Sequence, residues 1–419
     1  MIVLRGGAIV TSGGLVRGDI GIADGRIVSM GQSLSGDEVV DCSGCMIGPG
    51  FVDIHVHFRE PGQVWKEDIE TGSRAAAAGG FTAVVPMANT EPPTDSRALA
   101  ASMIERGRRV GLVELVPAAA LTRGRRGFEV SPLEELWDAG VRIFSDDGDS
   151  VAEADVLEEA MRRVAGLGGV VAQHAEDAAM TQGGHMHEGA VSARLAIGGL
   201  PAEAEERVVA RDLELAARTG VHYHVQHVST AGSVALLRDA KAAGLNVTAE
   251  ATPHHFSLDH HRLEDRDTMM KMYPPLRTED DTAAVAAAVR DGTIDAVATD
   301  HAPHTAEEKE VPFEQAPRGV IGLETSAAVT WSILEADPVA FFERMSVAPA
   351  RIGGFRQQGR WPGVGEVANL VVFDPDMIWI PEKFESRSQN SPWLGSTLRG
   401  RPVATFRRGR RIYGKDPEC

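Results

Sequence analysis

Cysteine, long apolar runs and positive charge are all scarce in this sequence, and each scarcity excludes a class of protein. Only three cysteines occur in 419 residues, and the Cys42–Cys45 pair has no second pair downstream with which to form a zinc ribbon. We interpret both as ordinary buried thiols and expect a reducing, cytoplasmic environment. Apolar runs such as 75–78 are far shorter than the ~20 residues of a membrane-spanning helix. No basic segment leading into an apolar stretch follows Met1, so we expect neither a signal peptide nor a membrane partner.

The charge balance of the chain is acidic. Lysine and arginine number 42 against 60 aspartates and glutamates, which gives a formal net charge of −18 at pH 7 with neutral histidine. A field of this sign repels polyphosphate, so we expect no nucleic acid partner. Hydrophobic residues make up 43% of the chain and charged residues 24%, which indicates a globular fold rather than disorder.

The middle of the chain alternates between short apolar strands and helical stretches rich in alanine, glutamate and arginine. This alternation is typical of βα units that build a parallel sheet. Eight strands are expected, at residues 51–56, 82–86, 112–117, 141–144, 170–173, 221–226, 247–251 and 296–299. Helices are expected between most of them, for example at 155–167, 203–219 and 282–290. Eight such units predict an α/β fold of the (β/α)8 TIM-barrel type, with its active site at the carboxyl ends of the strands.

Both ends of the chain are predicted instead to form short strands joined by turns. These strands are expected near residues 2–4, 8–10, 19–22, 27–28, 369–373, 404–406 and 411–413. Neither end can build a core alone, so we expect them to pack together as one small composite β-sandwich domain. The predicted division is 1–50 and 356–419 for the two parts of this β domain, and 51–355 for the catalytic barrel.

Residue types that bind metal ions stand at the ends of the predicted strands. Strand 51–56 contains His55 and runs into His57, and the alternation of side chains along a strand directs both imidazoles to the same side. Later strands end in Asp146 and Asp147, His174, His227 and Asp300. Imidazole nitrogens and carboxylate oxygens are good zinc ligands, and six such groups suit two metal ions that share a bridge. Eight other histidines are interpreted as structural: His185, His187, His222, His224, His254, His255, His260 and His261. For His254 and His255, which follow strand 247–251, a role in supporting the site stays open.

The segments around these residues resemble the motifs of the type I dihydroorotases, which are bacterial zinc enzymes of the amidohydrolase superfamily. The stretches that carry the resemblance are FVDIHVHFREPG at 51–62, PMANT at 86–90, FSDDG at 144–148, HVST at 227–230, TPHH at 252–255, PPLR at 274–277 and ATDHAPH at 298–304. Together they span most of the chain. The resemblance therefore implies a barrel with an attached β domain and a cyclic amide hydrolase activity.

The resemblance also implies a site for two zinc ions per chain. Its six ligands would be His55, His57, Asp147, His174, His227 and Asp300. Asp147, rather than its neighbour Asp146, would bridge the ions, because the family pattern places the bridge beside Gly148. Asp300 would also be the catalytic general acid and base. The FSDDG stretch offers no lysine, so the aspartate-bridged subgroup fits better than the hydantoinases or the lysine-bridged dihydroorotases.

The same resemblance implies a set of groups that bind the anionic substrate. Arg59, Asn89 and His304 correspond to the trio that holds the substrate carboxylate. Three positions depart from the family pattern, since Ala88 stands where proline is common, Tyr273 where asparagine is common and Arg318 where an aromatic residue is common. The implied substrate-binding residues are His57, Arg59, Asn89, Tyr273, His304, Arg318 and Gly319.

We therefore expect a dihydroorotase that closes N-carbamoyl-L-aspartate reversibly into (S)-dihydroorotate in de novo pyrimidine (UMP) biosynthesis. One alternative is a cyclic amidase of another ring, such as a hydantoinase or allantoinase, although a hydantoin lacks the carboxylate that Arg59 would bind. The other is a non-catalytic, dihydroorotase-like subunit of an aspartate transcarbamoylase complex, although loss of metal ligands would mark such a protein. We expect a homodimer, and association with aspartate transcarbamoylase stays open.

Overall fold

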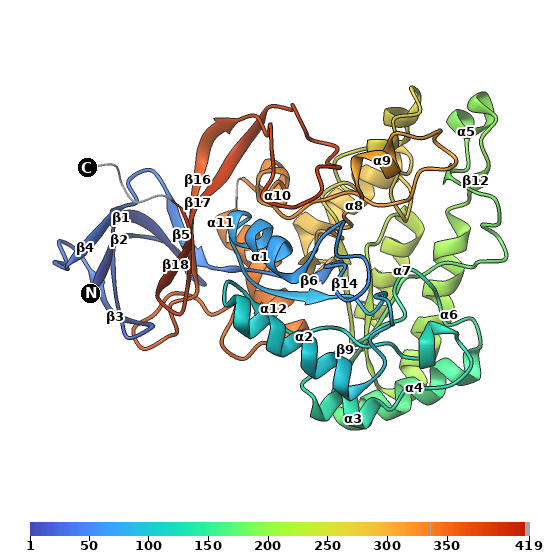
Figure 1. The fold of residues 1–419 in the computed structure, drawn as a ribbon, viewed down its shortest axis with the longest axis horizontal. Helices are drawn as coiled ribbons and strands as arrows, with labels where there is room; N and C mark the ends of the chain where they lie inside the picture. Colours follow the sequence, from blue (N-terminus) through green and yellow to red (C-terminus); the bar gives the residue numbers. More distant parts are fainter. Residues whose placement is uncertain (336, 415–419) are drawn as a thin grey trace.

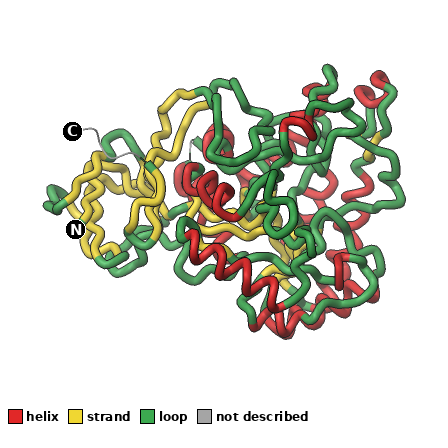
Figure 2. The backbone as a smooth tube through the Cα atoms, in the orientation of Figure 1, coloured by secondary structure: helices red, strands yellow, loops and turns green. Residues whose placement is uncertain are grey.

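The computed structural model describes residues 1–335 and 337–414 of the chain. A barrel surrounded by helices and a β domain lie side by side, and the first and last described strands both belong to the β domain (Figure 1). The β domain consists of strands and loops, whereas helices lie around the strands of the barrel (Figure 2).

Eight parallel strands form the barrel at the predicted places. They are β6 (Phe51–Val56), β7 (Phe81–Pro86), β8 (Glu114–Leu115), β9 (Ile143–Phe144), β10 (Val170–Gln173), β13 (His222–Val225), β14 (Val247–Ala251) and β15 (Ala296–Val297). Their pairing gives two parallel sheets, β6-β7-β8 and β15-β14-β13-β10-β9. Isolated bridges between Ala119 and Phe144 and between Val56 and His301 join the two sheets into a ring. The predicted (β/α)8 barrel is confirmed.

The barrel strands are buried on both faces. In β6, Val52 and Ile54 belong to the cluster inside the barrel, while Phe51 belongs to the layer beneath the helices. There Phe51 packs edge-on against Phe81, with ring centroids 5.7 Å apart. Two-sided burial explains why these strands are nearly continuous apolar runs in the sequence. The apolar run of each strand stops where polar residues begin, so the polar residues stand at the strand ends.

Helices cover the outside of the barrel. They are α1 (Ile69–Ala78), α2 (Arg97–Val110), α3 (Leu133–Asp138), α4 (Ala154–Leu167), α6 (Glu203–Thr219), α7 (Ala231–Ala242), α8 (Glu279–Asp291), α10 (Ser326–Leu334), α11 (Pro338–Phe342), α12 (Ala348–Ile352) and the π-helical turn η4 (Glu343–Val347). The expected helices match α4, α6 and the centre of α8. Helix α8 begins three residues earlier than expected, because Thr278 and Asp281 form a reciprocal cap at its first turn. Within the described residues, we find no helix that is both long and apolar enough to cross a membrane.

Smaller elements cover the carboxyl ends of the barrel strands. They are β11 (Met186–His187), α5 (Ala190–Leu195), β12 (Gly199–Leu200), α9 (Ala306–Lys309) and the 3-10 turns η1 (Arg123–Arg125), η2 (His260–Leu263) and η3 (Thr268–Met270). Several of these loops share a small apolar core of their own, which includes Met186, Leu263 and Phe313. This core holds the loops in place above the barrel.

The β domain combines strands from both ends of the chain in one eight-stranded sheet. Its members are β1 (Ile2–Thr11), β2 (Gly14–Ala23), β3 (Arg26–Gly31), β4 (Glu38–Asp41), β5 (Met46–Pro49), β16 (Leu370–Trp379), β17 (Leu398–Arg407) and β18 (Arg410–Tyr413). The two ends meet where β5 pairs with β16 in antiparallel register. Residues from both ends, such as Ile9 and Phe406, share one core. The composite β domain is confirmed, and Cys42 and Cys45 are buried free thiols in it.

The connection between β16 and β17 leaves the β domain and reaches the barrel. Here the Ser388 hydroxyl donates to the Lys66 carbonyl at 2.8 Å, and the Ile321 amide donates to the Asn390 carbonyl at 3.0 Å. A segment that the sequence assigns to the β domain thus lies over the catalytic face. The boundaries at residues 50 and 355 stay predictions.

Candidate active site

A cavity of about 190 Å³ opens at the carboxyl ends of the barrel strands. Its lining consists of His57, Arg59, Asn89, Asp147, Gly148, His174, His227, Tyr273, Asp300, Ala302, His304, Arg318 and Gly319. Every site residue that the sequence predicts lines this cavity except His55, which is fully buried behind it. The predicted side chains therefore converge on one place.

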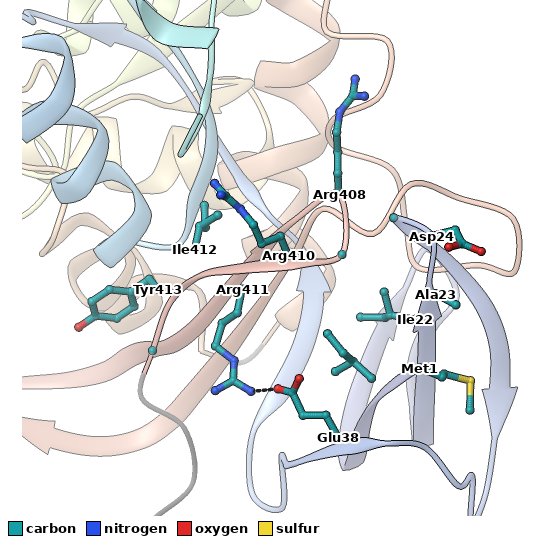
Figure 3. Close-up of a pocket in the computed structure, with 14 residues that line it drawn as sticks. Met1, Ile22, Ala23, Asp24, Glu38, Arg408, Arg410, Arg411, Ile412 and Tyr413 are labelled. Atoms are coloured by element: carbon teal, nitrogen blue, oxygen red, sulfur yellow. Dashed lines mark hydrogen bonds and ion pairs between the residues drawn. The ribbon is translucent and has the colours of Figure 1, made fainter. Parts of the chain in front are cut away.

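A larger hollow of about 770 Å³ lies on the β domain, far from these residues in the sequence. It is lined by Arg408, Arg410 and Arg411 on one side and by Glu38 on the other, where Glu38 forms an ion pair with Arg411 (Figure 3). The Arg408 guanidinium donates to the Gln357 side chain at 2.9 Å. None of the predicted site residues lines this hollow. Although this hollow is larger than the cavity at the strand ends, it contains none of the side chains expected to carry out the chemistry.

The first group of possible metal ligands stands on β6 and after β15. The distance from His57 Nε2 to Asp300 Oδ1 is 2.8 Å, and the distance from His55 Nε2 to the same oxygen is 3.6 Å. Asp147 faces both rings, with 3.3 Å from its Oδ1 to His55 Nε2 and 3.5 Å from its Oδ2 to His57 Nε2. Two imidazoles and two carboxylates thus surround one small space.

The second group lies on the other side of Asp147. His174 follows β10 and His227 follows β13, and their facing atoms Nδ1 and Nε2 are 2.9 Å apart. Asp147 Oδ1 lies 3.9 Å from the first nitrogen and 3.6 Å from the second. The Asp147 carboxylate therefore stands between the two pairs of histidines, where a group that bridges two metal ions must be.

Its neighbour Asp146 points elsewhere. The Asp146 carboxylate accepts hydrogen bonds from the Thr122 amide at 3.1 Å and from the Thr122 hydroxyl. Asp147 is turned the other way because successive residues at a strand end alternate in direction. The structure thus separates two adjacent aspartates that the strand pattern alone leaves equivalent.

The electrostatics of the cluster favour a cation. Burial disfavours charge on His55, but the carboxylates of Asp147 and Glu250 outweigh burial and raise its pKa well above the usual value. Burial also opposes charge on Asp147, yet the neighbouring histidines lower its pKa well below the usual range. Burial, reinforced by His227, lowers the pKa of His174 to about 3. Carboxylates that attract positive charge toward these rings would attract a metal cation equally.

The donor atoms fit a metal ion on two further grounds. His55 Nε2 and Asp147 Oδ1 are buried without a hydrogen-bond partner among the described residues, and buried polar atoms are rarely left so. In addition, His227 and Asp300 adopt positive φ angles of 30° and 46°, which cost energy for residues other than glycine. Such strain is typical of functional sites. The residues present therefore fit a metal centre.

The strand pattern alone does not reveal the groups that support these possible ligands on the side away from the cavity. Glu250, in β14, lies with its Oε1 2.5 Å from His55 Nδ1, and its Oε2 lies 3.1 Å from His224 Nε2. A carboxylate behind an imidazole fixes the ring and strengthens its free nitrogen as a ligand. A charged residue within the apolar strand 247–251 is the signal that could have revealed this role. His224, which the sequence suggested to be structural, thus contacts Glu250, the residue that holds His55 in place.

The residues predicted to bind a carboxylate border the cluster of possible metal ligands. Arg59 is partly buried, and its Nε donates to the Pro303 carbonyl at 3.3 Å. Desolvation lowers the pKa of Arg59 to about 10 against the opposing effect of Asp300 and Asp147, so the group remains charged at neutral pH. Asn89 joins both halves of the site, since its Oδ1 lies 2.9 Å from His57 Nδ1 and its Nδ2 lies 3.4 Å from Asp147 Oδ2.

His304, Arg318 and Gly319 form the opposite wall of the cavity. His304 Nε2 donates to the Arg318 carbonyl at 2.9 Å, and burial, with Arg59 nearby, lowers the pKa of His304 to about 2. A side chain at Gly319 would come within 2.7 Å of Ala302, so this position requires glycine.

Tyr273 forms the remaining wall of the cavity, between the possible metal ligands and the loop that carries Arg318. Its ring lies 4.4 Å from the ring of His174 and 4.1 Å from the guanidinium carbon of Arg318. The phenol donates to Glu176, away from the centre of the cavity. The Arg318 guanidinium thus lies over the face of the Tyr273 ring, and the phenol is engaged by Glu176.

Comparisons with known proteins agree with this geometry. A family model described as Dihydro-orotase-like matches residues 44–233. The dihydroorotase of Pelotomaculum thermopropionicum is 44% identical over 98% of this chain and 97% of its own length. The dihydroorotase of Mycobacterium tuberculosis is 43% identical over 94% of each chain. Among solved structures, the L-hydantoinase (dihydropyrimidinase) of Arthrobacter aurescens superposes with a TM-score of 0.88 at 25% identity, over 100% of this chain and 96% of its own.

The fold and the site together define a metal-dependent cyclic amide hydrolase of the amidohydrolase superfamily. Within this class, the chain shares 44% and 43% of its residues with two dihydroorotases over nearly its full length. The chain belongs to the dihydroorotase family.

Proposed function

We propose that this protein is a dihydroorotase, which closes N-carbamoyl-L-aspartate into (S)-dihydroorotate with loss of water and catalyses the reverse hydrolysis. One observation carries the proposal. A charged arginine, Arg59, shares a small cavity with a cluster of histidines and aspartates at the strand ends. A cyclic amide that also bears a carboxylate matches both features.

The proposed cofactor is a pair of zinc ions. His55, His57 and Asp300 would hold one ion, His174 and His227 the other, and Asp147 would bridge them. Zinc in such a site supplies a Lewis acid for the amide carbonyl and lowers the pKa of bound water toward ~7. The nitrogen and oxygen donors of the cluster support this choice of metal.

Asp300 is the proposed proton carrier. Ring opening moves a proton from water to the departing amide nitrogen, and ring closure moves it back. The Asp300 carboxylate lines the cavity at the carboxyl end of β15 and accepts from His57 Nε2 at 2.8 Å. A carboxylate in this position can take the proton on one side of the reaction and return it on the other.

The remaining wall would recognise the substrate. Arg59, with Asn89 and His304, would bind its carboxylate, because a guanidinium forms paired hydrogen bonds with a carboxylate. Tyr273 would cap the pocket beside Arg318 and Gly319, with its phenol turned away toward Glu176. Backbone groups near Pro274 would then hold the imide.

The cellular setting is also proposed. The chemistry belongs to pyrimidine biosynthesis, which the relatives named dihydroorotase support. We place the protein in the cytoplasm as a homodimer that acts on a small molecule. Association with aspartate transcarbamoylase is a further proposal, since that enzyme makes the substrate.

A side-by-side assay tests the function. Zinc-loaded protein is given dihydroorotate, hydantoin and allantoin, and steady-state rates are measured for each. We expect turnover of dihydroorotate in both directions and little turnover of the uncharged rings. Faster turnover of hydantoin or allantoin would contradict the proposal and favour another cyclic amidase, while no turnover of any ring would favour the non-catalytic subunit.

Arg59→Lys tests the carboxylate anchor. A charge-assisted pair in a partly dry site contributes about 1.5 to 3 kcal/mol, and one ammonium cannot reproduce a paired contact. The variant should therefore raise KM for dihydroorotate by about tenfold or more, with a smaller effect on kcat. Arg163→Lys is the matched control, since Arg163 makes a paired contact with Glu134 on the outside of the barrel. An unchanged KM in Arg59→Lys would remove Arg59 from the substrate site.

A further inference from the structure

One side chain from the β16–β17 connection holds three residues of the cavity wall. Asn390 is 2% exposed, and its Nδ2 donates to the carbonyls of Ala302 at 3.1 Å and Gly319 at 3.2 Å. Its Oδ1 accepts from the His304 amide at 3.1 Å. Both amide hydrogens and the oxygen of this side chain are therefore used on residues that line the cavity.

These bonds connect two loops that are otherwise separate in the chain. Ala302 and His304 follow β15, whereas Gly319 belongs to the loop after α9. The loops approach so closely that a side chain at Gly319 would meet Ala302. The Asn390 carbonyl also accepts from the Ile321 amide at 3.0 Å. The loops are also joined directly, by the Ala302 amide to the Val320 carbonyl at 2.8 Å and by His304 Nε2 to the Arg318 carbonyl at 2.9 Å, and Asn390 reinforces their spacing from a third segment of the chain.

The same connection is anchored a second time near the start of the barrel. Glu67 is fully buried and accepts from the Ser386 hydroxyl and from the Arg387 amide at 3.1 Å. Glu67 also accepts from the Thr71 hydroxyl, and its Oε2 lies 3.3 Å from Nε2 of His301, the residue that follows Asp300. Both ends of the segment 386–390 are hydrogen-bonded to the barrel. These bonds hold Asn390 in position next to the two loops.

We propose that Asn390 is a positioning residue for substrate binding, which holds His304 and Gly319 at the spacing that the substrate carboxylate and ring require. The inference rests on the proposed function, since that function assigns His304 and Gly319 to the substrate. It adds a residue from the C-terminal part of the chain to the site. Asn390 acts through the loops and does not line the cavity itself.

The test compares Asn390→Ala with Asn369→Ala. Asn369 is a matched control, because it is 4% exposed and likewise joins two backbone groups, the Gln357 carbonyl and the Arg408 amide, at 2.8 Å each. Both variants lose a buried amide, but Asn369 lies in the β domain. We expect Asn390→Ala to raise KM for dihydroorotate about tenfold with kcat within threefold, and Asn369→Ala to leave both within twofold.

Hydrogen exchange gives a readout that needs no substrate. The peptide region 301–322 should exchange faster in Asn390→Ala than in the wild type, and unchanged in Asn369→Ala. Asn390→Ser, which keeps one hydroxyl, supplies a milder variant in case the alanine variant does not fold, and its KM should be intermediate. Equal KM changes in the two alanine variants, or unchanged exchange over 301–322, would overturn the inference. Wild-type protein that does not turn over dihydroorotate would instead contradict the proposed function, and exchange alone would then decide about Asn390.

Discussion

Asp300→Asn should lower kcat by about three to four orders of magnitude while the protein still folds and still binds substrate weakly. The carboxamide has almost the shape of the carboxylate, so the contact with His57 Nε2, now at 2.8 Å, can persist. It cannot take up a proton from water and return it to the amide nitrogen. Steady-state rates in both directions measure the effect, and the metal content of the same sample shows whether zinc was lost as well.

Asp295→Asn is the control for this variant. Asp295 stands at the opposite end of the same strand, β15, where it accepts from Lys241 Nζ at 2.6 Å and from the Ala249 amide at 2.9 Å. It makes no contribution to the cavity lining. The control should keep its kcat and lose only stability. If Asp300→Asn retained more than about a tenth of the wild-type rate, another group would have to carry the proton.

Asp147→Asn should remove metal and activity together. The Asp147 carboxylate lies between the two pairs of histidines, and a neutral carboxamide cannot bridge two cations. We expect close to two zinc ions per chain in the wild type, less than one in the variant, and a loss of turnover of at least about a thousandfold. Elemental analysis and rate measurements on the same preparation test both parts.

Asp146→Asn provides the comparison within one dipeptide. It removes the same charge one residue earlier, but the Asp146 carboxylate faces Thr122, where a carboxamide oxygen can still accept from the amide and the carboxamide nitrogen can donate to the hydroxyl. Metal content and kcat should stay near the wild-type values. A single tightly held zinc ion in fully active wild-type enzyme would contradict the proposed pair of ions. Equal metal loss in the two variants would contradict the assignment of Asp147 as the bridge.

Much of the fold and of the site was predictable because it depends on local pattern. Strands buried on both faces are continuous apolar runs, and their repetition with helices indicates a (β/α)8 barrel. Parallel strands bring their carboxyl ends to one face of the barrel. Residues that follow the strands therefore converge on that face independently of the loop conformations. Examples are His57, Asp147, His174 and Asp300.

Other features depend on contacts that no local pattern contains. The direction of Asp147 relative to Asp146, the turn of the Tyr273 phenol toward Glu176, and the support of His55 by Glu250 arise only when strands and loops are packed together. Each is a contact between residues far apart in the chain, and its geometry is set by the neighbours on both sides. Pattern alone leaves these choices equivalent.

Asn390 shows the difference most clearly. The sequence by itself determined the barrel, the composite β domain and the strand ends that carry the histidines and aspartates, because hydrophobic periodicity and parallel strand order are encoded locally. Nothing near Asn390 in the sequence points to a barrel, and the predicted boundaries place it in the β domain. Only the tertiary structure brings it to Ala302 and Gly319, which are 88 and 71 positions away, because buried carbonyls and amides in two loops need hydrogen-bond partners that the loops cannot supply.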